Sequence, residues 1–256
     1  MYAATTANTS NGATIIPFPS MKEDKPQRNK CVAKPHEAVE PIKDTADIEA
    51  AKNYLLNQEP RWKANPTNLR NYMMFVVNIN NALRISDLLD ICIDDILVKR
   101  VESANAITPD DIKEEVFIRE SKTGKTRYIF FGQNSKEAIC AYINALPTWD
   151  RNDFLFASRQ RDKATGRSKA ITRQMAWTII NKMGKEISKD RDKQLHLGPH
   201  SMRKTFGYQR IKANPDNPMI VAEISEIYNH SDIKTTYRYL GIDTETKKNL
   251  CIGHEL

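Results

Sequence analysis

The sequence lacks the segments that mark membrane or exported proteins. No apolar run approaches the roughly twenty residues that a membrane-spanning helix needs. The first residues, MYAATTANTSNG, lack the charged-then-apolar order of a secretory signal. No CxxC pair is present, which disfavours a disulfide framework or a zinc site. The four cysteines, expected as unpaired thiols of the reducing cytoplasm, are Cys31, Cys92, Cys140 and Cys251.

Positive charge is concentrated in one segment. The chain of 256 residues has a formal net charge of +7, and residues 161–212 hold 14 Lys and Arg against 4 Asp and Glu. The remainder of the chain is slightly acidic. A basic segment on an otherwise balanced chain is typical of proteins that bind nucleic acid. A solvated, lysine-rich helix surface is the alternative explanation of this charge.

Residues 1–42 differ from the rest of the chain. They mix Thr, Asn, Ser, Pro, Lys and Glu without a hydrophobic period, which predicts disorder. From residue 43 onward, apolar residues at turn spacing follow capping residues and predict a series of helices. The expected helix starts are Asp44 or Thr45, Pro66 capped by Asn65, Ser86, Asn134-Ser135, Thr172, Pro199, Asn217-Pro218 and Ser231. The last fifteen residues predict one more short helix, with Leu250 and Ile252 as its apolar contacts.

The hydrophobic period becomes strand-like between residues 96 and 132. VFIRE and RYIFFG predict two strands joined by a turn at Thr123-Gly124. A further strand near residues 97–101 is expected to pair with them. The segment RQRDKATGRSK (159–169) predicts a basic, flexible loop.

One stretch combines the side chains that phosphoryl chemistry needs. PHSMRKTFGYQR places His200 and Arg203 a helical turn apart, and NHSDIKTTYRYLG adds His230 and, nine residues later, Tyr239. Such an arginine would clamp a phosphate, the histidines would move protons and the phenol would attack. A phenol has a pKa of about 10, so it needs activation by cationic neighbours.

Four motifs in this order resemble the tyrosine recombinase, or phage integrase, family. ALRISDLL resembles its first arginine box, SKTGKTRYIFF its lysine hairpin, PHSMRKTFG its HxxR box and NHSDIKTTYRYLG its histidine-to-tyrosine box. The resemblance covers roughly residues 65–241. It implies a mainly α fold with a small antiparallel β-sheet (α+β). It also implies site-specific DNA recombination through a 3′-phosphotyrosyl intermediate, without ATP, a metal or another cofactor.

The resemblance assigns a role to each matching residue. Arg84 and Arg203 would hold the nonbridging oxygens of the scissile phosphate, where charge builds in the transition state. Tyr239 would attack the phosphorus, and Lys122 would give a proton to the leaving 5′-oxygen. Lys125 is the alternative to Lys122.

The remaining matches are supporting groups. His200 would assist proton transfer at the tyrosine, and His230 would hydrogen-bond the phosphate. Asp87 matches an acidic position one helical turn after the first arginine and would orient its neighbours. Tyr237 is the alternative nucleophile, but the spacing from His230 favours Tyr239.

Two positions depart from the family pattern. Ala82 and Asn229 stand where the family often has glycine. Asparagine is the best non-glycine residue for a left-handed backbone, so Asn229 is compatible with the pattern. The basic side chains expected to contact DNA are Lys125, Arg127, Arg167, Lys169, Arg173 and Lys204.

The resemblance also implies an organisation and a set of partners. Residues 43–256 would form a catalytic domain with a C-terminal docking helix, without a full core-binding domain. Double-stranded DNA would be the substrate, bound by a homotetramer on paired sites with an accessory DNA-bending or clamp protein. Such a protein would belong to the cytoplasm of a bacterium or to a phage or mobile element.

Three other functions use part of the same pattern. A type IB-like topoisomerase shares the chemistry and acts as a monomer. A regulator that binds DNA without cutting it would keep the fold, although a complete set of site residues argues against it. A phosphatase using the HxxR pair lacks a metal or cysteine nucleophile and fits least well.

Overall fold

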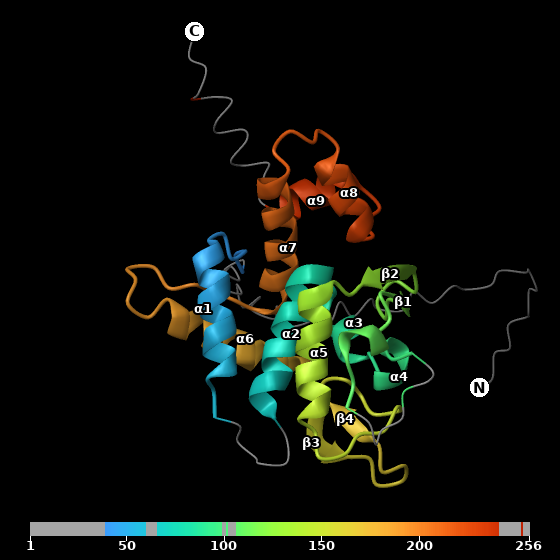
Figure 1. Cartoon of the computed structure of the whole chain (residues 1–256). Helices are drawn as coiled ribbons and strands as arrows, with labels where there is room; N and C mark the ends of the chain where they lie inside the picture. Colours follow the sequence, from blue (N-terminus) through green and yellow to red (C-terminus); the bar gives the residue numbers. More distant parts are fainter. Residues whose placement is uncertain (1–38, 60–65, 99–100, 102–105, 241–251, 253–256) are drawn as a thin grey trace, which may run out of the picture. The chain divides into compact units, whose positions relative to one another are not determined.

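The structure, a computed structural model, describes residues 39–59, 66–98, 101, 106–240 and 252 (Figure 1). The disorder predicted for residues 1–42 lies outside this set except at residues 39–42, which pack against α7 (Pro199–Ala213). There, Ile42 is buried and its amide donates to Thr205 Oγ1 at 2.8 Å. The helix predicted for the last fifteen residues also lies outside it, apart from Ile252.

Helices dominate the described residues, and short strands form two separate antiparallel hairpins. This confirms a mainly α fold with small antiparallel sheets. The first half contains α1 (Thr45–Leu56), α2 (Thr67–Asn81), α3 (Ile85–Leu89), α4 (Ile93–Ile96), η1 (Pro109–Asp111), β1 (Glu115–Arg119) and β2 (Thr126–Phe130). The second half contains α5 (Gln133–Asn144), β3 (Ala157–Arg161), β4 (Ser168–Ala170), α6 (Arg173–Ile187), α7, α8 (Ile220–Ile227) and α9 (Ile233–Leu240).

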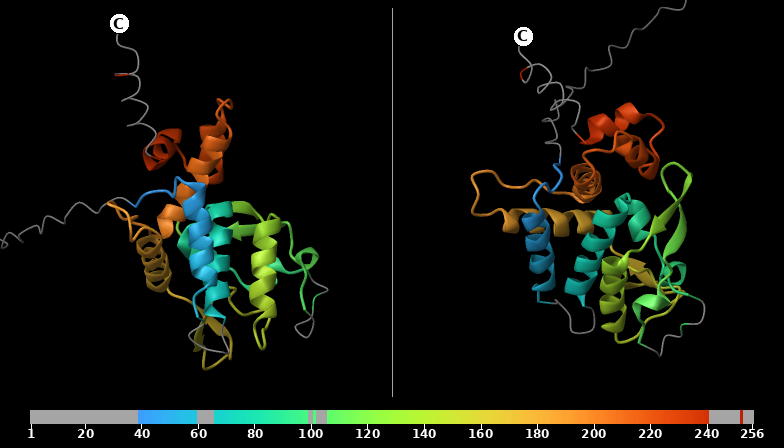
Figure 2. Two further views of the ribbon diagram at one scale, coloured as in Figure 1. Left: turned by 60° about the vertical axis from the view of Figure 1, so that its left-hand side comes forward. Right: turned by 45° about the horizontal axis from the view of Figure 1, so that its top comes forward.

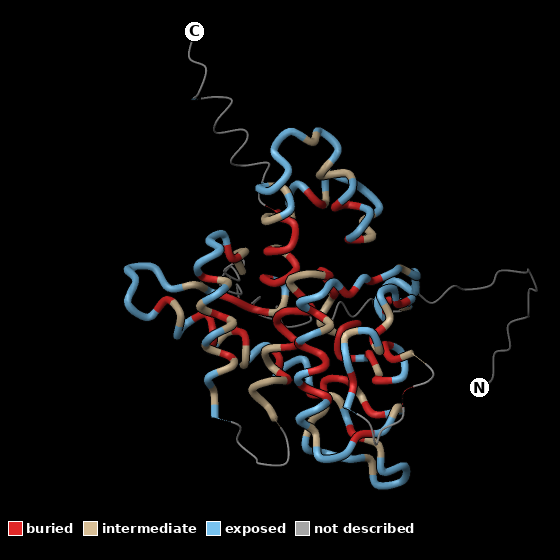
Figure 3. Tube along the Cα trace, in the orientation of Figure 1, coloured by how far each residue is buried: buried red, intermediate tan, exposed pale blue. Residues whose placement is uncertain are grey.

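Helix α2 is the centre of the main core. It lies between α1 and α5, and α6 packs across α1 (Figures 1 and 2). Five consecutive residues of α2 are buried, because helices cover it on several sides; they are Met73, Met74, Phe75, Val76 and Val77. Figure 3 shows buried residues along α2 and on the adjoining turns of α7.

A second, smaller apolar cluster holds α8 and α9 against α7. Its buried members are Ala82, Phe206, Ile224, Tyr228 and Leu240. Tyr239 packs on this cluster from the end of α9. The helix that carries the expected nucleophile is therefore positioned by a small local core and not by the main one.

Three predicted helix starts are confirmed. The Asp44 side chain accepts the amide of Ala46 at the start of α1, and the Thr172 hydroxyl accepts the amide of Met175 at the start of α6. Pro199 is the first residue of α7, where its missing N–H costs nothing. Met175, in the first turn of α6, is 45% exposed.

The other five starts were predicted at the wrong residue. Helix α5 begins at Gln133 and not at Asn134-Ser135, and α8 begins at Ile220 and not at Asn217-Pro218. Helix α2 begins at Thr67 with Pro66 in the cap position, so Pro66 is not its first residue. Helix α3 begins at Ile85, and Arg84 itself occupies the cap position that was assigned to Ser86. Before α9, Asp232 and not Ser231 bonds a first-turn amide, that of Lys234 at 2.9 Å. A carboxylate accepts such an amide at least as well as a serine hydroxyl does, so sequence preferences do not separate neighbouring candidates.

The hairpin of β1 and β2 has the predicted position and turn. Strand residues pair in register from Glu115–Phe130 to Arg119–Thr126, and Gly124 has a φ of +68° in the turn. The expected third strand near residues 97–101 is wrong for the described residues, because Leu97 makes only an isolated bridge to Ile112. Helix α4 ends immediately before it.

The basic segment 159–169, predicted as a loop, belongs mostly to the second hairpin. Strands β3 and β4 pair with an irregular register. The Asp162 carboxylate accepts the amides of Ala164 and Thr165, and Gly166 adopts a φ of +68°. The strands carry no alternation of apolar residues that could have revealed them, because most of β3 is solvent-exposed.

Candidate active site

Tyr239 lies against the first turn of α7. Its phenolic oxygen is 3.3 Å from Nδ1 of His200 and 3.4 Å from the carbonyl oxygen of His200. The rings of Tyr228 and His230 pack edge-on to it, with centroids 5.5 and 5.8 Å away. Tyr237, the alternative nucleophile, is exposed on α9. The structure thus brings Tyr239 together with both histidines that the sequence singled out.

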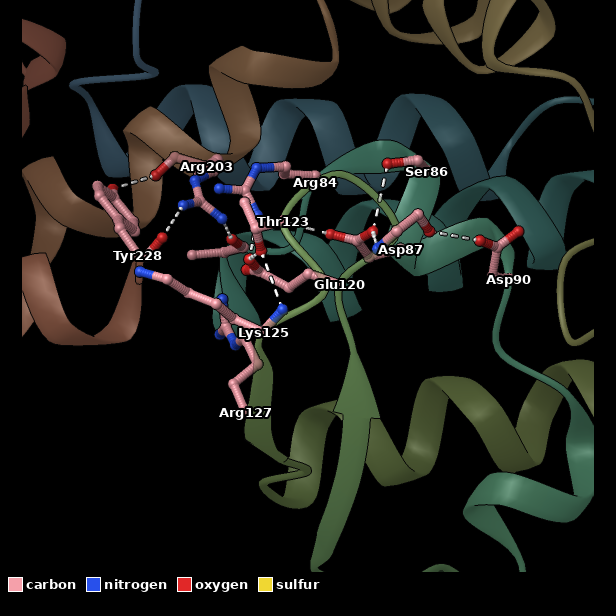
Figure 4. Close-up of polar contacts among 12 residues, drawn as sticks. Arg84, Ser86, Asp87, Asp90, Glu120, Thr123, Lys125, Arg127, Arg203 and Tyr228 are labelled. Carbon is pink, nitrogen blue, oxygen red and sulfur yellow. Dashed lines mark hydrogen bonds and ion pairs between the residues drawn. The ribbon is translucent and has the colours of Figure 1, made fainter. Parts of the chain in front are cut away.

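The packed rings of Tyr228, His230 and Tyr239 form the tyrosine cluster. Arg203 is buried beside it. Its guanidinium donates to the carbonyls of Ala82 and Tyr228, each at 2.6 Å, and stacks 4.4 Å from the centroid of the Tyr228 ring. The Tyr228 hydroxyl returns a bond to the Arg203 carbonyl. Arg203 therefore joins the end of α2 to the end of α8, and its side chain is only 2% exposed (Figure 4).

Both carbonyls that hold Arg203 lie at left-handed turns. Ala82 ends α2 with a φ of +53°, and Asn229, which follows Tyr228, has a φ of +57°. These are the two positions at which the family often has glycine. The left-handed backbone is thus kept here with an alanine and an asparagine, at a cost that glycine would avoid.

Arg84 occupies the cap position of α3. Its Nη1 lies 2.5 Å from Oε2 of Glu120 and 3.8 Å from Oδ2 of Asp87. Asp87 in turn accepts the backbone amide of Ser121, at 3.0 Å, in the turn of the first hairpin. The predicted supporting residue therefore touches both the first arginine and the hairpin that carries the lysines (Figure 4).

Lys122 and Lys125 are both exposed in the turn between β1 and β2. Lys122 is among the positive charges that lower the pKa of His200, after burial, Arg203, Lys204 and Arg84. This places the charge of Lys122 within electrostatic reach of the tyrosine cluster.

The histidines and the tyrosine have shifted pKa values. Burial raises the pKa of Tyr239 to about 12, against the opposing effect of Arg203 and Arg84. Burial, and then Arg203, lowers the pKa of His230 to about 4. The pKa of His200 is also lowered, by burial first. At neutral pH both imidazoles are uncharged, so each has a nitrogen that accepts a proton or a hydrogen bond.

Sequence reasoning missed two buried residues of this site. Glu120 continues the inward-facing positions of β1, after Val116 and Ile118, and a carboxylate at an inward strand position was the available signal. Tyr228 follows Ile224 by one turn on the inner face of α8. The pKa of Tyr228 is raised by burial.

Arg127, expected to contact DNA, is a further guanidinium of the same cluster. It donates to the carbonyl of Asn81 at 2.8 Å and is half-buried. Burial, and then Arg203, lowers the pKa of Arg127 to about 10, with smaller contributions from Glu120, Arg84 and Asp87. Three guanidiniums and two carboxylates therefore interact in one partly buried volume.

The other expected DNA contacts lie in different surroundings. Lys169 and Arg173 are exposed. Lys204 is half-buried, donates to the carbonyl of Val39 and lies 5.4 Å from the centroid of the Tyr239 ring. Arg167 stacks 4.2 Å from the Phe154 ring centroid and contacts Sγ of Cys92 at 2.7 Å.

Among the described residues, no three His, Cys, Asp or Glu side chains are grouped in a way suited to a metal ion. No helix of the described part of the chain is long and apolar enough to cross a membrane. The described cysteines, Cys92 and Cys140, are unpaired.

Comparison with known proteins identifies relatives of this fold and site. The sequence profile described as "Phage integrase family" matches residues 45–246. A probable integrase/recombinase, YoeC of Bacillus subtilis, is 31% identical over 82% of this chain and 93% of its own length. The tyrosine recombinase XerD of Corynebacterium glutamicum is 25% identical over 60% of this chain and 47% of its own length. The chain thus spans nearly all of one relative and about half of the other.

Solved structures share the fold at lower identity. The XerH site-specific recombinase, in a post-cleavage complex with palindromic difH substrate, has a TM-score of 0.56 at 15% identity, covering 86% of this chain and 54% of that one. The XerA recombinase has a TM-score of 0.54 at 17% identity, covering 81% and 61%. The fold is that of a tyrosine recombinase catalytic domain. The chain belongs to the Phage integrase family.

Proposed function

We propose that this chain cuts and rejoins double-stranded DNA at specific sites, with Tyr239 as the nucleophile. The observation that carries the proposal is the contact between the Tyr239 phenol and Nδ1 of His200, within the field of Arg203 and Arg84. The family membership and the DNA-bound complex of the XerH recombinase support the same substrate.

The reaction is a transesterification that needs no external energy. The Tyr239 oxygen attacks the phosphorus, and the bond from phosphorus to the 5′-oxygen breaks. The phenolic proton passes to Nδ1 of His200, which the lowered pKa keeps free of a proton at neutral pH. Lys122 gives a proton to the departing 5′-oxygen. The products are a 3′-phosphotyrosyl ester and a free 5′-hydroxyl, and rejoining is the reverse.

The charges at the site are suited to one phosphodiester. Arg84, Arg127 and Arg203 carry three positive charges, and Asp87 and Glu120 carry two negative ones. A phosphodiester brings one negative charge, so its arrival would balance the cluster. Charge that builds on the nonbridging oxygens would then be met by guanidiniums already in position. In uncharged His230, Nδ1 would accept from Thr236 Oγ1, 2.8 Å away, and the single N–H, on Nε2, would donate to the phosphate.

The exposed cations suggest how duplex DNA is held. Lys125, Lys169 and Arg173 would contact backbone phosphates and contribute affinity that falls steeply with salt. Lys204, Arg127 and Arg167 are engaged within the protein, so their contribution to affinity would be smaller. A tetramer on paired sites, with an accessory bending or clamp protein, remains part of the proposal.

Covalent trapping tests the proposal without a known target sequence. A random-sequence library of nicked duplexes is incubated with the full chain, and molecules bound covalently after denaturation are recovered and sequenced. Because the short fragment beside the nick diffuses away, cleavage becomes irreversible and the ester accumulates. We expect an adduct with wild-type protein, none with Tyr239→Phe and an undiminished yield with Tyr237→Phe.

Each other outcome has a definite meaning. An adduct lost in Tyr237→Phe and kept in Tyr239→Phe would overturn the assignment of the nucleophile. Specific duplex binding without any adduct would identify a non-cutting regulator. Relaxation of supercoiled plasmid by a monomer without strand exchange between two sites would identify the topoisomerase-like alternative.

A further inference from the structure

Glu120 contacts two separate parts of the candidate site, the arginine at the start of α3 and the turn of the first hairpin. Its side chain is 1% exposed, and Oε2 lies 2.5 Å from Nη1 of Arg84. The same oxygen accepts a hydrogen bond from Thr123 Oγ1 at 2.6 Å. One carboxylate oxygen therefore joins the arginine at the start of α3 to the turn that carries Lys122 (Figure 4).

The backbone of Glu120 closes that same turn. Its amide donates to the carbonyl of Lys125 at 2.8 Å, and its carbonyl accepts from the amide of Gly124 at 2.9 Å. Ser121 is held next to it, because its hydroxyl donates to Asp90 at 2.9 Å. Lys122 thus lies between two anchored residues, while its own side chain is exposed.

The charge on Glu120 is maintained in spite of its burial. Burial alone would raise the pKa of this carboxyl, but the positive charge of Arg84 and the hydrogen bond from Thr123 outweigh it and leave the pKa below its ordinary value. The second oxygen, Oε1, is buried and accepts no hydrogen bond from the described residues. A buried carboxylate is costly unless it is paired with a positive charge and hydrogen-bonded, as Oε2 is here.

We propose that Glu120 is a positioning residue, which holds Arg84 and the turn that carries Lys122 in a fixed relative position. This inference rests on the proposed function, in which Arg84 holds the phosphate and Lys122 protonates the leaving oxygen. Oε2 contacts both Arg84 and Thr123, the residue that follows Lys122 in the hairpin turn. A phosphate bound by Arg84 would therefore lie at a fixed distance from this turn, which two independent surface side chains would not ensure.

Two variants separate the contact of Glu120 with Arg84 from its contact with Thr123. Glu120→Gln keeps the size of the side chain and removes its charge, so it weakens both contacts. Thr123→Val removes only the bond to the turn. Glu115→Gln, at the exposed other end of β1, is the matched control because it makes the same chemical change outside the cluster.

The substrate separates loss of the proton donor from loss of the phosphate clamp. In one duplex the bridging 5′-oxygen at the cut is replaced by sulfur. A thiol has a pKa of about 8.5, so a thiolate leaves without a proton and no longer needs Lys122. The duplexes are those recovered by covalent trapping with the wild-type protein, and cleavage is measured as a single-turnover rate.

On the oxygen substrate we expect cleavage to fall about 100-fold in Glu120→Gln and about tenfold in Thr123→Val. On the sulfur substrate we expect Thr123→Val to match the wild type, as Lys122→Ala should, and Glu120→Gln to remain about tenfold slow because Arg84 is still misplaced. Glu115→Gln should equal the wild type on both. Duplex binding by Glu120→Gln should change less than threefold.

Several results would overturn this inference while leaving the proposed function intact. One is a wild-type rate in Glu120→Gln on both substrates. Another is an equal loss by Thr123→Val on both substrates, which would mean that the turn does not act through the proton donor. A loss of duplex binding as large as the loss of cleavage would give Glu120 a merely structural role. If the wild-type chain forms no adduct with any duplex, the proposed function itself fails.

Discussion

The phenolic oxygen of Tyr239 lies 3.3 Å from Nδ1 of His200, although the two residues are 39 positions apart in the sequence. The contact joins the last described turn of α9 to the first turn of α7. Burial raises the pKa of Tyr239 to about 12, so the free phenol holds its proton throughout the physiological range. His200, the proposed base, is in direct contact with it.

The pH dependence of cleavage tests this pairing. The pKa of His200 is lowered from 6.5, so the imidazole is already deprotonated at pH 7 and stays so at higher pH. We expect single-turnover cleavage to be nearly flat from about pH 7 to 9, and to fall at lower pH as His200 takes up a proton. In His200→Gln, we expect a slower rate that rises about tenfold per pH unit, because only the phenolate fraction reacts. A tenfold rise per unit in the wild type would show that His200 is not the base.

Arg203 should contribute to stability as well as to catalysis. Its guanidinium bonds two buried carbonyls, those of Ala82 and Tyr228, and a lysine amine cannot span both. We expect Arg203→Lys to lower the free energy of unfolding by about 2–3 kcal/mol and to abolish the covalent adduct. Urea unfolding followed by circular dichroism measures the first effect.

Arg210→Lys is the control for this loss, since Arg210 is exposed on the same helix. Its free energy of unfolding should change by about 0.5 kcal/mol or less. Equal effects of the two substitutions would show that the carbonyl bonds of Arg203 contribute nothing to stability.

Local signals in the sequence predicted much of the fold. Asp44 and Thr172 cap the helices that they precede, and the Thr123-Gly124 turn joins the expected strands. These features depend on neighbouring residues only, so a single sequence is enough to find them. The strands β3 and β4 were missed because their exposed, basic residues show no alternation.

The ordered motifs predicted which distant residues come together better than they predicted the surroundings of those residues. The contacts of Tyr239 with His200, and of Arg203 with the carbonyl of Ala82, cross long stretches of chain. Spacing within a motif cannot give such distances; the family resemblance supplied the grouping. Glu120 was missed because its significance appears only when Arg84, 36 positions earlier in the chain, is placed beside it.

Asn229 offers a test of the left-handed turn that positions the carbonyl of Tyr228. Its φ is +57°, and its side-chain Nδ2 is buried without a hydrogen-bond partner among the described residues. Asparagine tolerates this backbone better than alanine does, and glycine better still. We expect Asn229→Ala to lower the free energy of unfolding by about 1 kcal/mol, and Asn229→Gly to leave it unchanged or slightly higher. Chemical unfolding measures both, and equal losses in the two variants would contradict the backbone argument.

Gly207 should link packing to catalysis. A Cβ at this position would lie 2.5 Å from Oη of Tyr228 and 2.7 Å from Cδ2 of Leu240, the residue next to the proposed nucleophile. Both neighbours belong to the small cluster that holds α8 and α9 against α7. We expect Gly207→Ala to lower the free energy of unfolding by about 1–3 kcal/mol. We also expect cleavage by the folded protein to fall at least tenfold, because Leu240 cannot move without Tyr239.

Gly184→Ala separates these two effects. Its Cβ would also be crowded, at 2.8 Å from Cγ of Leu197 and 2.9 Å from the carbonyl oxygen of Leu195, but at the main core. This variant should lose a similar stability and, at temperatures where it is folded, cleave trapped duplex within about threefold of the wild-type rate. Measuring unfolding and single-turnover cleavage on both variants decides the matter. If the two alanines slow cleavage equally, the small cluster has no special part in placing Tyr239, and the effect of Gly207 is one of stability alone.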